Sequence, residues 1–265
     1  MFLNTYEDYN GINGQPPQNE DYAPIVKYPS VTYHDVRFNV DVNDRFNTYL
    51  GIDNVGNKLP PYGLTGIGGG SGIYDLPGLQ NVREERVASP WGAPSGALRI
   101  GDIAGLPVVF LPRHDKGHRL SPSDINYRAN IDVLKRAGVT DLVSLSACGS
   151  FKEELPPGTF VLIDQFVDRT HKRESSFFGK GLVAHVSMAH PVSPRLRIHL
   201  ASAAMAEGIT VVRDGTYVCM EGPQFSTLAE SLTYKQLGYS VIGMTNMPEA
   251  KLAREAELCY ATVAM

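Results

Sequence analysis

Arg113 and His114 are the side chains of this sequence best suited to hold an anion, because they follow an apolar run at 108–111 after a single proline. A guanidinium binds two oxygens of a phosphate through its planar fork, and an imidazole adds a directional hydrogen bond. Open α/β sheets bind their ligands beyond the ends of such strands. The sequence therefore predicts an anion site in the segment 112–118, with a solvated turn as the alternative.

A metal site is a further interpretation of this segment, since His114 and His118 are both residues of a metal-binding type. No third ligand stands near them in the sequence, and Gly117 interrupts the helix that this spacing requires. We therefore expect no metal here.

The glycine-rich segment 66–72 contains Ser71 and could also surround an anion. Glycines let the backbone amides approach an oxygen closely, and the serine hydroxyl adds another donor. The segment has neither the Gly-Lys-Ser/Thr ending of a nucleotide P-loop nor the glycine spacing of the dinucleotide fingerprint. A flexible linker is the alternative interpretation.

Small residues end another apolar run at 145–150, where Ser146 and Ala147 leave space and amide donors for a ligand. Cys148 in the same segment could act as a nucleophile. Nothing nearby in the sequence would activate it, however, and a free cysteine is commonly a small buried apolar residue. We interpret Cys148 as a buried thiol.

Two later segments, 221–226 and 244–249, each lie between an expected strand and an expected helix. In the first, Phe225 could stack on a flat base, while Ser226 either caps the helix or binds the ligand. In the second, Pro248 begins a helix and Thr245 lies near its positive end, which suits an anion. Ordinary helix capping is the alternative for the second segment.

An α/β frame is needed to position these segments, and the sequence predicts one. From residue 108 onward, short apolar runs alternate with helical patterns, which is typical of helices packed around a mixed, largely parallel sheet. The capping sequence at 121–124 predicts a helix that ends at Gly138. The other expected helices are 194–207 and 226–237, and the expected strands are 142–145, 160–167, 209–212 and 240–244.

Composition excludes several classes of protein. The 265 residues include 24 basic and 28 acidic side chains, a net charge of −4, which leaves no positive excess for a nucleic-acid backbone. The apolar runs are far shorter than the roughly 18 residues of a membrane span. The amino terminus has neither the basic segment nor the apolar core of a secretory signal. We therefore expect a cytoplasmic protein with reduced cysteines and no nucleic-acid or membrane partner.

Residues 1–62 differ in texture from the rest of the chain. They are rich in Asn, Asp, Tyr, Gly and Pro, with some alternation at 36–40, and the prolines at 60 and 61 mark a boundary. We expect an N-terminal extension of unknown role over 1–62 and one compact domain over 63–265.

Together these segments resemble the 5′-methylthioadenosine phosphorylase branch of the trimeric purine nucleoside phosphorylases, over about residues 64–265. The resemblance rests on ordered motifs: GGGSG, PRHDKGH, SPSDINYRANI, SACGS, IDQFVDRT, MEGPQFSTLAES and GMTNMPEAKLAREAELCYA. It implies the nucleoside phosphorylase fold, a homotrimer, and phosphate as co-substrate with no metal or other cofactor. The residues implied to hold phosphate are Ser71, Arg113, His114, Ser146, Ala147 and Thr245. Those implied to bind the nucleoside are Phe225, Ser226, Ile242 and Met244, with His185 lent to a neighbouring subunit.

The resemblance implies that phosphate stabilises an oxocarbenium-like sugar and then attacks it as the purine departs. The leaving purine also needs a proton. Similar proteins continue past the Ala-Met ending with an acidic loop and a closing helix, so the acid is expected beyond Met265, and the domain is expected to be incomplete at its C-terminus. Our leading hypothesis is phosphorolysis of 5′-methylthioadenosine, in purine and methionine salvage. The alternatives are a methylthioinosine or general purine nucleoside phosphorylase, and a non-catalytic remnant that binds phosphate or subunits.

Overall fold

The computed structural model describes residues 36–43, 46–52, 64–69 and 78–265. The chain divides into two units, Met1–Tyr62 and Gly63–Met265, which we describe separately. In the first unit, β1 (Val36–Asn43) and β2 (Phe46–Ile52) form an antiparallel pair in which Val36 faces Ile52. The alternation at 36–40 thus belongs to a strand.

The second unit is built on an eight-stranded sheet, in the order β11-β9-β14-β7-β3-β6-β5-β4. Neighbours β14-β7, β7-β3 and β3-β6 run parallel, whereas β4-β5, β5-β6 and β14-β9 run antiparallel. The strands are β3 (Leu64–Gly69), β4 (Gln80–Glu85), β5 (Leu98–Ile103), β6 (Leu106–Pro112), β7 (Val139–Ser146), β9 (Phe160–Leu162), β11 (Val211–Val212) and β14 (Cys259–Ala264).

A smaller sheet has the order β10-β12-β13-β8, with β10, β12 and β13 parallel and β8 antiparallel to β13. Its strands are β10 (Gln165–Arg169), β12 (Thr216–Met220), β13 (Val241–Gly243) and β8 (Gly149–Ser150). The predicted α/β class with a mixed, largely parallel sheet is confirmed.

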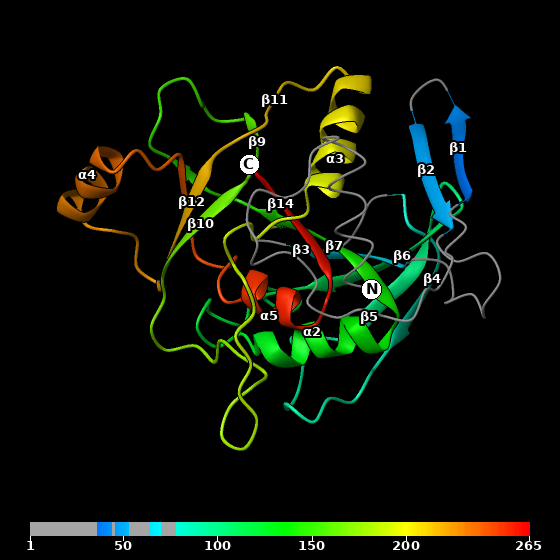
Figure 1. The fold of residues 1–265 in the computed structure, drawn as a ribbon, viewed down its shortest axis with the longest axis horizontal. Coiled ribbons are helices and arrows are strands. Elements are labelled where there is room, and N and C mark those ends of the chain that lie inside the picture. The colour runs from blue at the N-terminus through cyan, green and yellow to red at the C-terminus, as the bar shows by residue number, and fades with distance from the viewer. Residues whose placement is uncertain (1–35, 44–45, 53–63, 70–77) are drawn as a thin grey trace. The chain divides into compact units, whose positions relative to one another are not determined.

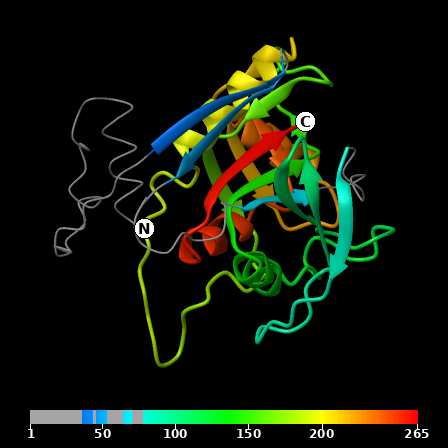
Figure 2. The same ribbon diagram turned by 90° about the vertical axis from the view of Figure 1, so that its right-hand side faces the viewer.

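Helices α2 (Tyr127–Arg136) and α5 (Glu249–Glu255) lie on one side of the larger sheet, and α3 (Pro194–Ala206) lies on the other (Figures 1 and 2). The apolar residues of α2 and α5 that face the central strands are buried in the core, whereas α3 buries only Leu196 and Ala201. Val109, Val133, Leu142 and Leu252 are at most 1% exposed. Within the described residues no helix is long and apolar enough to cross a membrane.

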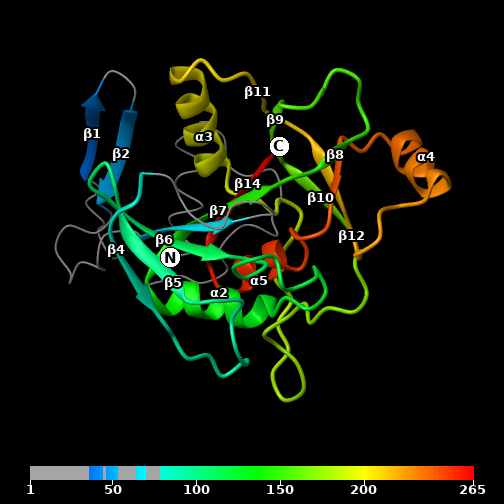
Figure 3. The same ribbon diagram turned by 180° about the vertical axis from the view of Figure 1, so that it is seen from behind.

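Helix α4 (Leu228–Gln236) stands at the edge of the smaller sheet, away from the other helices (Figure 3), and has no buried residue. It was expected to begin at Ser226, but Thr227 is its N-cap, in a capping box with Glu230. Ser226 instead pairs its hydroxyl with that of Ser231 at 2.7 Å. The alternative in which Ser226 caps the helix is therefore wrong.

Two other expected boundaries differ from those in the structure. Helix α2 begins at Tyr127 rather than near Ser121, because the Asn126 side chain accepts a hydrogen bond from the Ala129 amide. It ends where predicted, since Gly138 adopts a positive φ of 91° just after it. The strand expected at 160–167 is broken into β9 and β10, which belong to different sheets.

Candidate active site

Arg113 lies at the carboxyl end of β6, where three parallel strands of the larger sheet end side by side. The register pairs Gly69 of β3 with Pro112 of β6, and Gly68 of β3 with Ser144 of β7. The Arg113 guanidinium is therefore close to both neighbours. Its Nη2 donates to Ser144 Oγ at 2.6 Å and to the Gly68 carbonyl at 3.2 Å.

Arg113 is also joined to the segment that leads into α5. Its Nε donates to Glu249 Oε2 at 2.7 Å, and its Nη1 donates to Thr245 Oγ1 at 3.0 Å. Arg113 is 1% exposed and Glu249 is 5% exposed, so this is a buried ion pair. Burial alone would lower the pKa of Arg113, but the Glu249 carboxylate raises that pKa above its ordinary value. The guanidinium therefore stays charged.

A network of buried polar side chains supports this ion pair. Tyr260 donates its hydroxyl hydrogen to Glu249 Oε1 at 2.9 Å, and Asn246 Nδ2 donates to Tyr260 at 2.7 Å and to Thr262 Oγ1 at 2.6 Å. Asn246 and Thr262 are fully buried. Buried polar groups need such partners, so the network fixes the carboxylate that holds Arg113.

Sequence reasoning missed Glu249 and the polar residues behind it, Ser144, Asn246, Tyr260 and Thr262. A signal for two of them exists: Ser144 in β7 and Thr262 in β14 are hydroxyl residues with an apolar neighbour on each side. A polar side chain in a strand buried on both faces needs a buried partner. That signal points to a polar network but not to its members.

His114 follows Arg113 and is 3% exposed. Its Nδ1 lies 2.9 Å from the Leu120 carbonyl, and its ring stacks on that of His118 with centroids 4.3 Å apart. A carbonyl only accepts, so Nδ1 carries the hydrogen. Burial lowers the pKa of His114 to about 4, although the hydrogen bond to Leu120 opposes that shift. The ring is therefore neutral near pH 7, and its Nε2 is an acceptor.

The described residues contain no group of three or more His, Cys, Asp or Glu side chains that could hold a metal ion.

Ser146 ends β7 and is connected to Thr245 through Tyr217 of β12. The Ser146 and Tyr217 hydroxyls are 3.1 Å apart, and Tyr217 is also hydrogen bonded to the backbone of Thr245. Ala147 is exposed beside them. Burial raises the pKa of the adjacent Cys148 to about 11, so its thiol stays protonated at neutral pH. A nucleophilic thiolate is disfavoured there.

The residues expected to bind the nucleoside are less closely grouped. Ile242 lies in β13 and Met244 just after it, both half-buried. A Cβ added at Gly222 would be 2.6 Å from Met244 Sδ, so Met244 packs against the segment 221–226. Phe225 is 86% exposed, and His185 is exposed in the segment between β10 and α3. These two side chains lie on the surface and not in the buried cluster.

The structure therefore brings Arg113 and Thr245 into direct contact. Ser146 is linked to Thr245 through Tyr217, and His114 is next to Arg113 in the chain. Ser71 lies outside the described residues, as do positions 70 and 72 of its glycine-rich segment.

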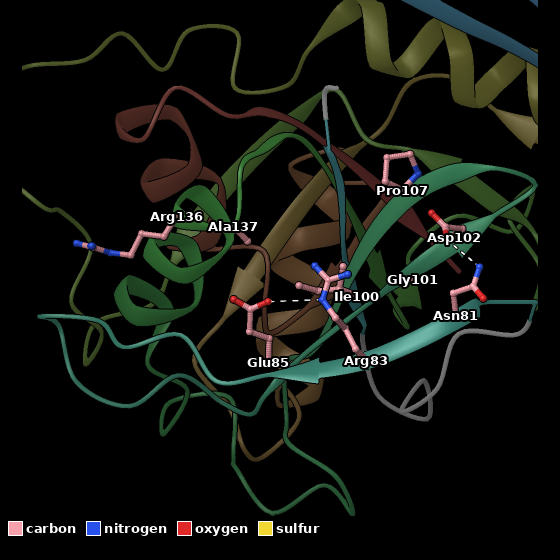
Figure 4. Close-up of a pocket in the computed structure, with 9 residues that line it drawn as sticks. All are labelled: Asn81, Arg83, Glu85, Ile100, Gly101, Asp102, Pro107, Arg136 and Ala137. Atoms are coloured by element: carbon pink, nitrogen blue, oxygen red, sulfur yellow. Dashed lines mark hydrogen bonds and ion pairs between the residues drawn. The ribbon is translucent and has the colours of Figure 1, made fainter. Parts of the chain in front are cut away.

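A separate groove of about 400 Å³ lies between β4, β5 and the end of α2 (Figure 4). Arg83 pairs with Glu85 there, and Asn81 donates to Asp102 at 3.2 Å. None of the expected site residues lines it. Its charges already have partners, so it offers no unpaired charge for a ligand.

The fold belongs to a known class. Residues 65–265 match the phosphorylase superfamily, and the chain belongs to that family. It is 85% identical over 202 residues to the S-methyl-5′-thioadenosine phosphorylase of Bradyrhizobium diazoefficiens, a match that covers 76% of this chain and 69% of the relative. The protein of the same name from Cereibacter sphaeroides is 62% identical over 202 residues, with 76% and 70% covered.

Solved structures agree with these relatives. Methylthioadenosine phosphorylase from Schistosoma mansoni in complex with adenine superposes with a TM-score of 0.74 at 39% identity, covering 77% of this chain and 80% of that chain. Its apo form gives a TM-score of 0.74 with 77% and 79% covered. The nucleoside phosphorylase fold expected from the sequence is confirmed.

Proposed function

We propose that this protein is a pentosyltransferase that cleaves 5′-methylthioadenosine with phosphate, giving adenine and 5-methylthioribose 1-phosphate. The observation that carries this conclusion is the 85% identity over 202 residues to an S-methyl-5′-thioadenosine phosphorylase. The reaction returns adenine to purine salvage and the sugar phosphate to methionine salvage.

Phosphate binds at the ends of β3, β6 and β7 in this proposal. Arg113 supplies the charge, Thr245 and Ser146 supply hydroxyls, and Ala147 supplies a backbone amide. Support comes from the 3.0 Å hydrogen bond between Arg113 and Thr245, which brings two of these residues into contact. Ser71 completes the phosphate site.

His114 has a defined role in this arrangement because its hydrogen is on Nδ1. Its Nε2 accepts the hydrogen of monohydrogen phosphate, while the unprotonated phosphate oxygens accept from Arg113 and Thr245. The phosphate is thereby oriented with a charged oxygen available for attack. Holding it beneath the anomeric carbon also turns a bimolecular collision into a reaction within one complex.

The nucleoside occupies the side of the site formed by Phe225, Ser226, Ile242 and Met244. Phe225 stacks on the purine, and its 86% exposure leaves its ring face accessible. His185 belongs to the pocket of a neighbouring subunit in a homotrimer, which suits its exposure in this chain. A cytoplasmic location is part of the same proposal.

The chemical step needs charge stabilisation more than a nucleophilic side chain. As the purine departs, the sugar gains oxocarbenium character, and the bound phosphate stabilises that cation before attacking it. The purine leaves with a proton from an acid, and we assign no residue of this chain to that transfer.

Chromatographic detection of adenine tests the proposal directly. The protein is incubated with 5′-methylthioadenosine, with and without phosphate, and adenine is expected only when phosphate is present. Competition with methylthioinosine and adenosine then measures substrate preference, and 5′-methylthioadenosine should have the highest kcat/KM. Binding of phosphate and nucleoside in a calorimeter with no purine released from any nucleoside would contradict the proposal.

A further inference from the structure

We infer that Arg173 is a positioning residue that sets the spacing between the two segments that bind the nucleoside. This inference rests on the proposed function. Arg173 follows β10, and its side chain is 1% exposed although it is charged. A buried arginine needs partners for its N–H groups, and those of Arg173 lie in the two segments concerned.

The first of these segments runs from Met244 to Met247, between β13 and α5. Arg173 Nη1 donates to the carbonyls of both Met244 and Met247, the latter at 2.6 Å. The two carbonyls stand on either side of Thr245 and Asn246. The guanidinium therefore fixes the backbone that carries the Thr245 hydroxyl and the Met244 side chain.

The second segment begins at Glu221, directly after β12. Arg173 Nη2 donates to the Glu221 carbonyl at 2.7 Å, and Nε lies 3.4 Å from its carboxylate. That carboxylate also accepts from the amides of His171 and Lys172 at 2.6 and 3.2 Å, and from Ser123. Burial alone would raise the pKa of Glu221, but these hydrogen bonds lower it to about 2. Glu221 is thus a fixed anchor for Arg173.

Arg173 also reaches α2, because Nη1 lies 3.1 Å from the Tyr127 hydroxyl and the guanidinium carbon is 5.4 Å from the Tyr127 ring centre. One side chain therefore joins the ends of β10, β12 and β13 to α2. The planar fork directs its donors along fixed lines, whereas a lysine ammonium is a compact charge that cannot span the same carbonyls.

The contact that Arg173 governs is the one between Met244 and Gly222, where the two segments meet. Any Cβ at Gly222 would lie 2.6 Å from Met244 Sδ, so the spacing there is already minimal. Phe225 and Ser226 follow Gly222, and Thr245 follows Met244. A shift between these segments separates the base-stacking ring from the phosphate site. Misplacement by about 1 Å costs a reaction on the order of 100-fold.

Arg173→Lys and Arg173→Met test the inference, with Arg195→Lys as the matched control. Arg195 forms an ion pair with Asp141 and joins α3 to β7, so its loss weakens packing without touching either segment. We expect kcat/KM for 5′-methylthioadenosine to fall by about 10- to 100-fold in both Arg173 variants and by less than about 2-fold in the control. Phosphate affinity should change less than nucleoside affinity, because Arg113 is held by Glu249 and Ser144 independently of Arg173 and itself donates to Thr245.

Thermal unfolding gives the Tm of all three variants, and each activity assay is then run well below the lowest Tm. A loss of activity at that temperature reflects positioning and not unfolding. Calorimetric binding of 5′-methylthioadenosine in the presence of phosphate is a second readout that requires no turnover. Wild-type protein that releases no adenine contradicts the proposed function alone. The role of Arg173 is overturned if its variants bind and turn over nucleoside like the wild type. A full wild-type kcat/KM in Arg173→Lys alone would also overturn it.

Discussion

Arg113 and Glu249 form a buried ion pair with Nε and Oε2 2.7 Å apart, and it joins residues separated by 136 positions in the chain. Arg113 comes from the end of β6 and Glu249 from the first turn of α5. The pair holds the segment with Thr245 against the carboxyl ends of the central strands. Each partner is expensive to remove, because the other would remain as an uncompensated buried charge.

Glu249→Gln should lower the free energy of unfolding by about 3 to 5 kcal/mol, since the Arg113 charge would lose its carboxylate partner. Urea denaturation followed by circular dichroism measures this change. Glu207→Gln is the control, because Glu207 is exposed at the end of α3. Equal unfolding free energies for Glu249→Gln and the wild type would show that the carboxylate is not needed to balance Arg113.

Arg113→Ala should weaken phosphate binding by about 2 to 3 kcal/mol, the scale for losing a charged hydrogen-bonding partner. Isothermal titration calorimetry with inorganic phosphate measures the change, on protein whose folding has been checked by circular dichroism. Arg136→Ala on the surface of α2 is the control and should bind phosphate normally. An unchanged phosphate Kd in Arg113→Ala would remove this residue from the site.

Protein stability should depend on pH through His114. Burial lowers its pKa from the ordinary 6.5 to about 4, so between these values the unfolded chain binds more protons than the folded one. Stability from this residue is therefore present above pH 6.5 and is lost as the pH falls toward 4, by an amount of about 2 to 3 kcal/mol. Urea unfolding from pH 7 to pH 4 measures the slope.

His114→Gln provides the comparison for that titration because glutamine does not bind a proton in this range. The variant should lose less stability between pH 6.5 and pH 4 than the wild type does. Parallel curves for the two proteins would mean that His114 titrates normally.

Gly243→Ala should displace Tyr217. A Cβ at this position would be 1.9 Å from the Tyr217 hydroxyl, which pairs with Ser146. Overpacking of this kind costs about 1 to 3 kcal/mol, and Ser146 would lose its partner. Thermal unfolding should show a lower Tm than in Gly179→Ala, where an added Cβ meets nothing within 4 Å. An equal Tm for Gly243→Ala and Gly179→Ala would show that Tyr217 leaves room for a Cβ at position 243.

The sequence predicted the end of α2 better than its beginning, for a physical reason. Gly138 ends the helix with a positive φ that few other residues adopt easily, so the signal is local and strong. Ser121 was the expected cap, but Asn126 is also of a residue type that caps helices well. Asn126 caps the Ala129 amide and also donates to the Trp91 carbonyl, whereas Ser121 is paired with Asp124. The contact with Trp91 is not encoded in the local pattern.

The break between β9 and β10 was not predictable from apolar patterning. Ile163 donates its amide to the Thr262 carbonyl in the larger sheet, while the Asp164 carboxylate accepts from the Gly215 amide beside the smaller one. The chain therefore changes sheets within two residues because of partners far along the sequence. Asp164 and Gln165 interrupt the apolar residues between 160 and 167, but two polar residues can also stand inside one continuous strand.

The sequence predicted which strand ends form the candidate site, but it did not predict that Glu249 would balance the charge of Arg113. Arg113 and Thr245 were expected near one another because both follow strands, and their 3.0 Å contact agrees with that expectation. Glu249 was overlooked because an acidic residue in the first turn of a helix ordinarily complements the helix dipole. Only the three-dimensional arrangement shows that its carboxylate faces Arg113.

The place of β14 in the larger sheet has a consequence for how the domain folds. Among the described strands, β9 and β11 reach the rest of that sheet only through β14, which pairs with β9 on one side and β7 on the other. A ribosome makes β9 and β11 well before β14, so these strands must wait, unpaired with the main sheet, until the late strand inserts. Such non-local closure is intrinsically slow. The edges of β9 and β11 stay exposed during this wait, and the risk of aggregation is greatest then.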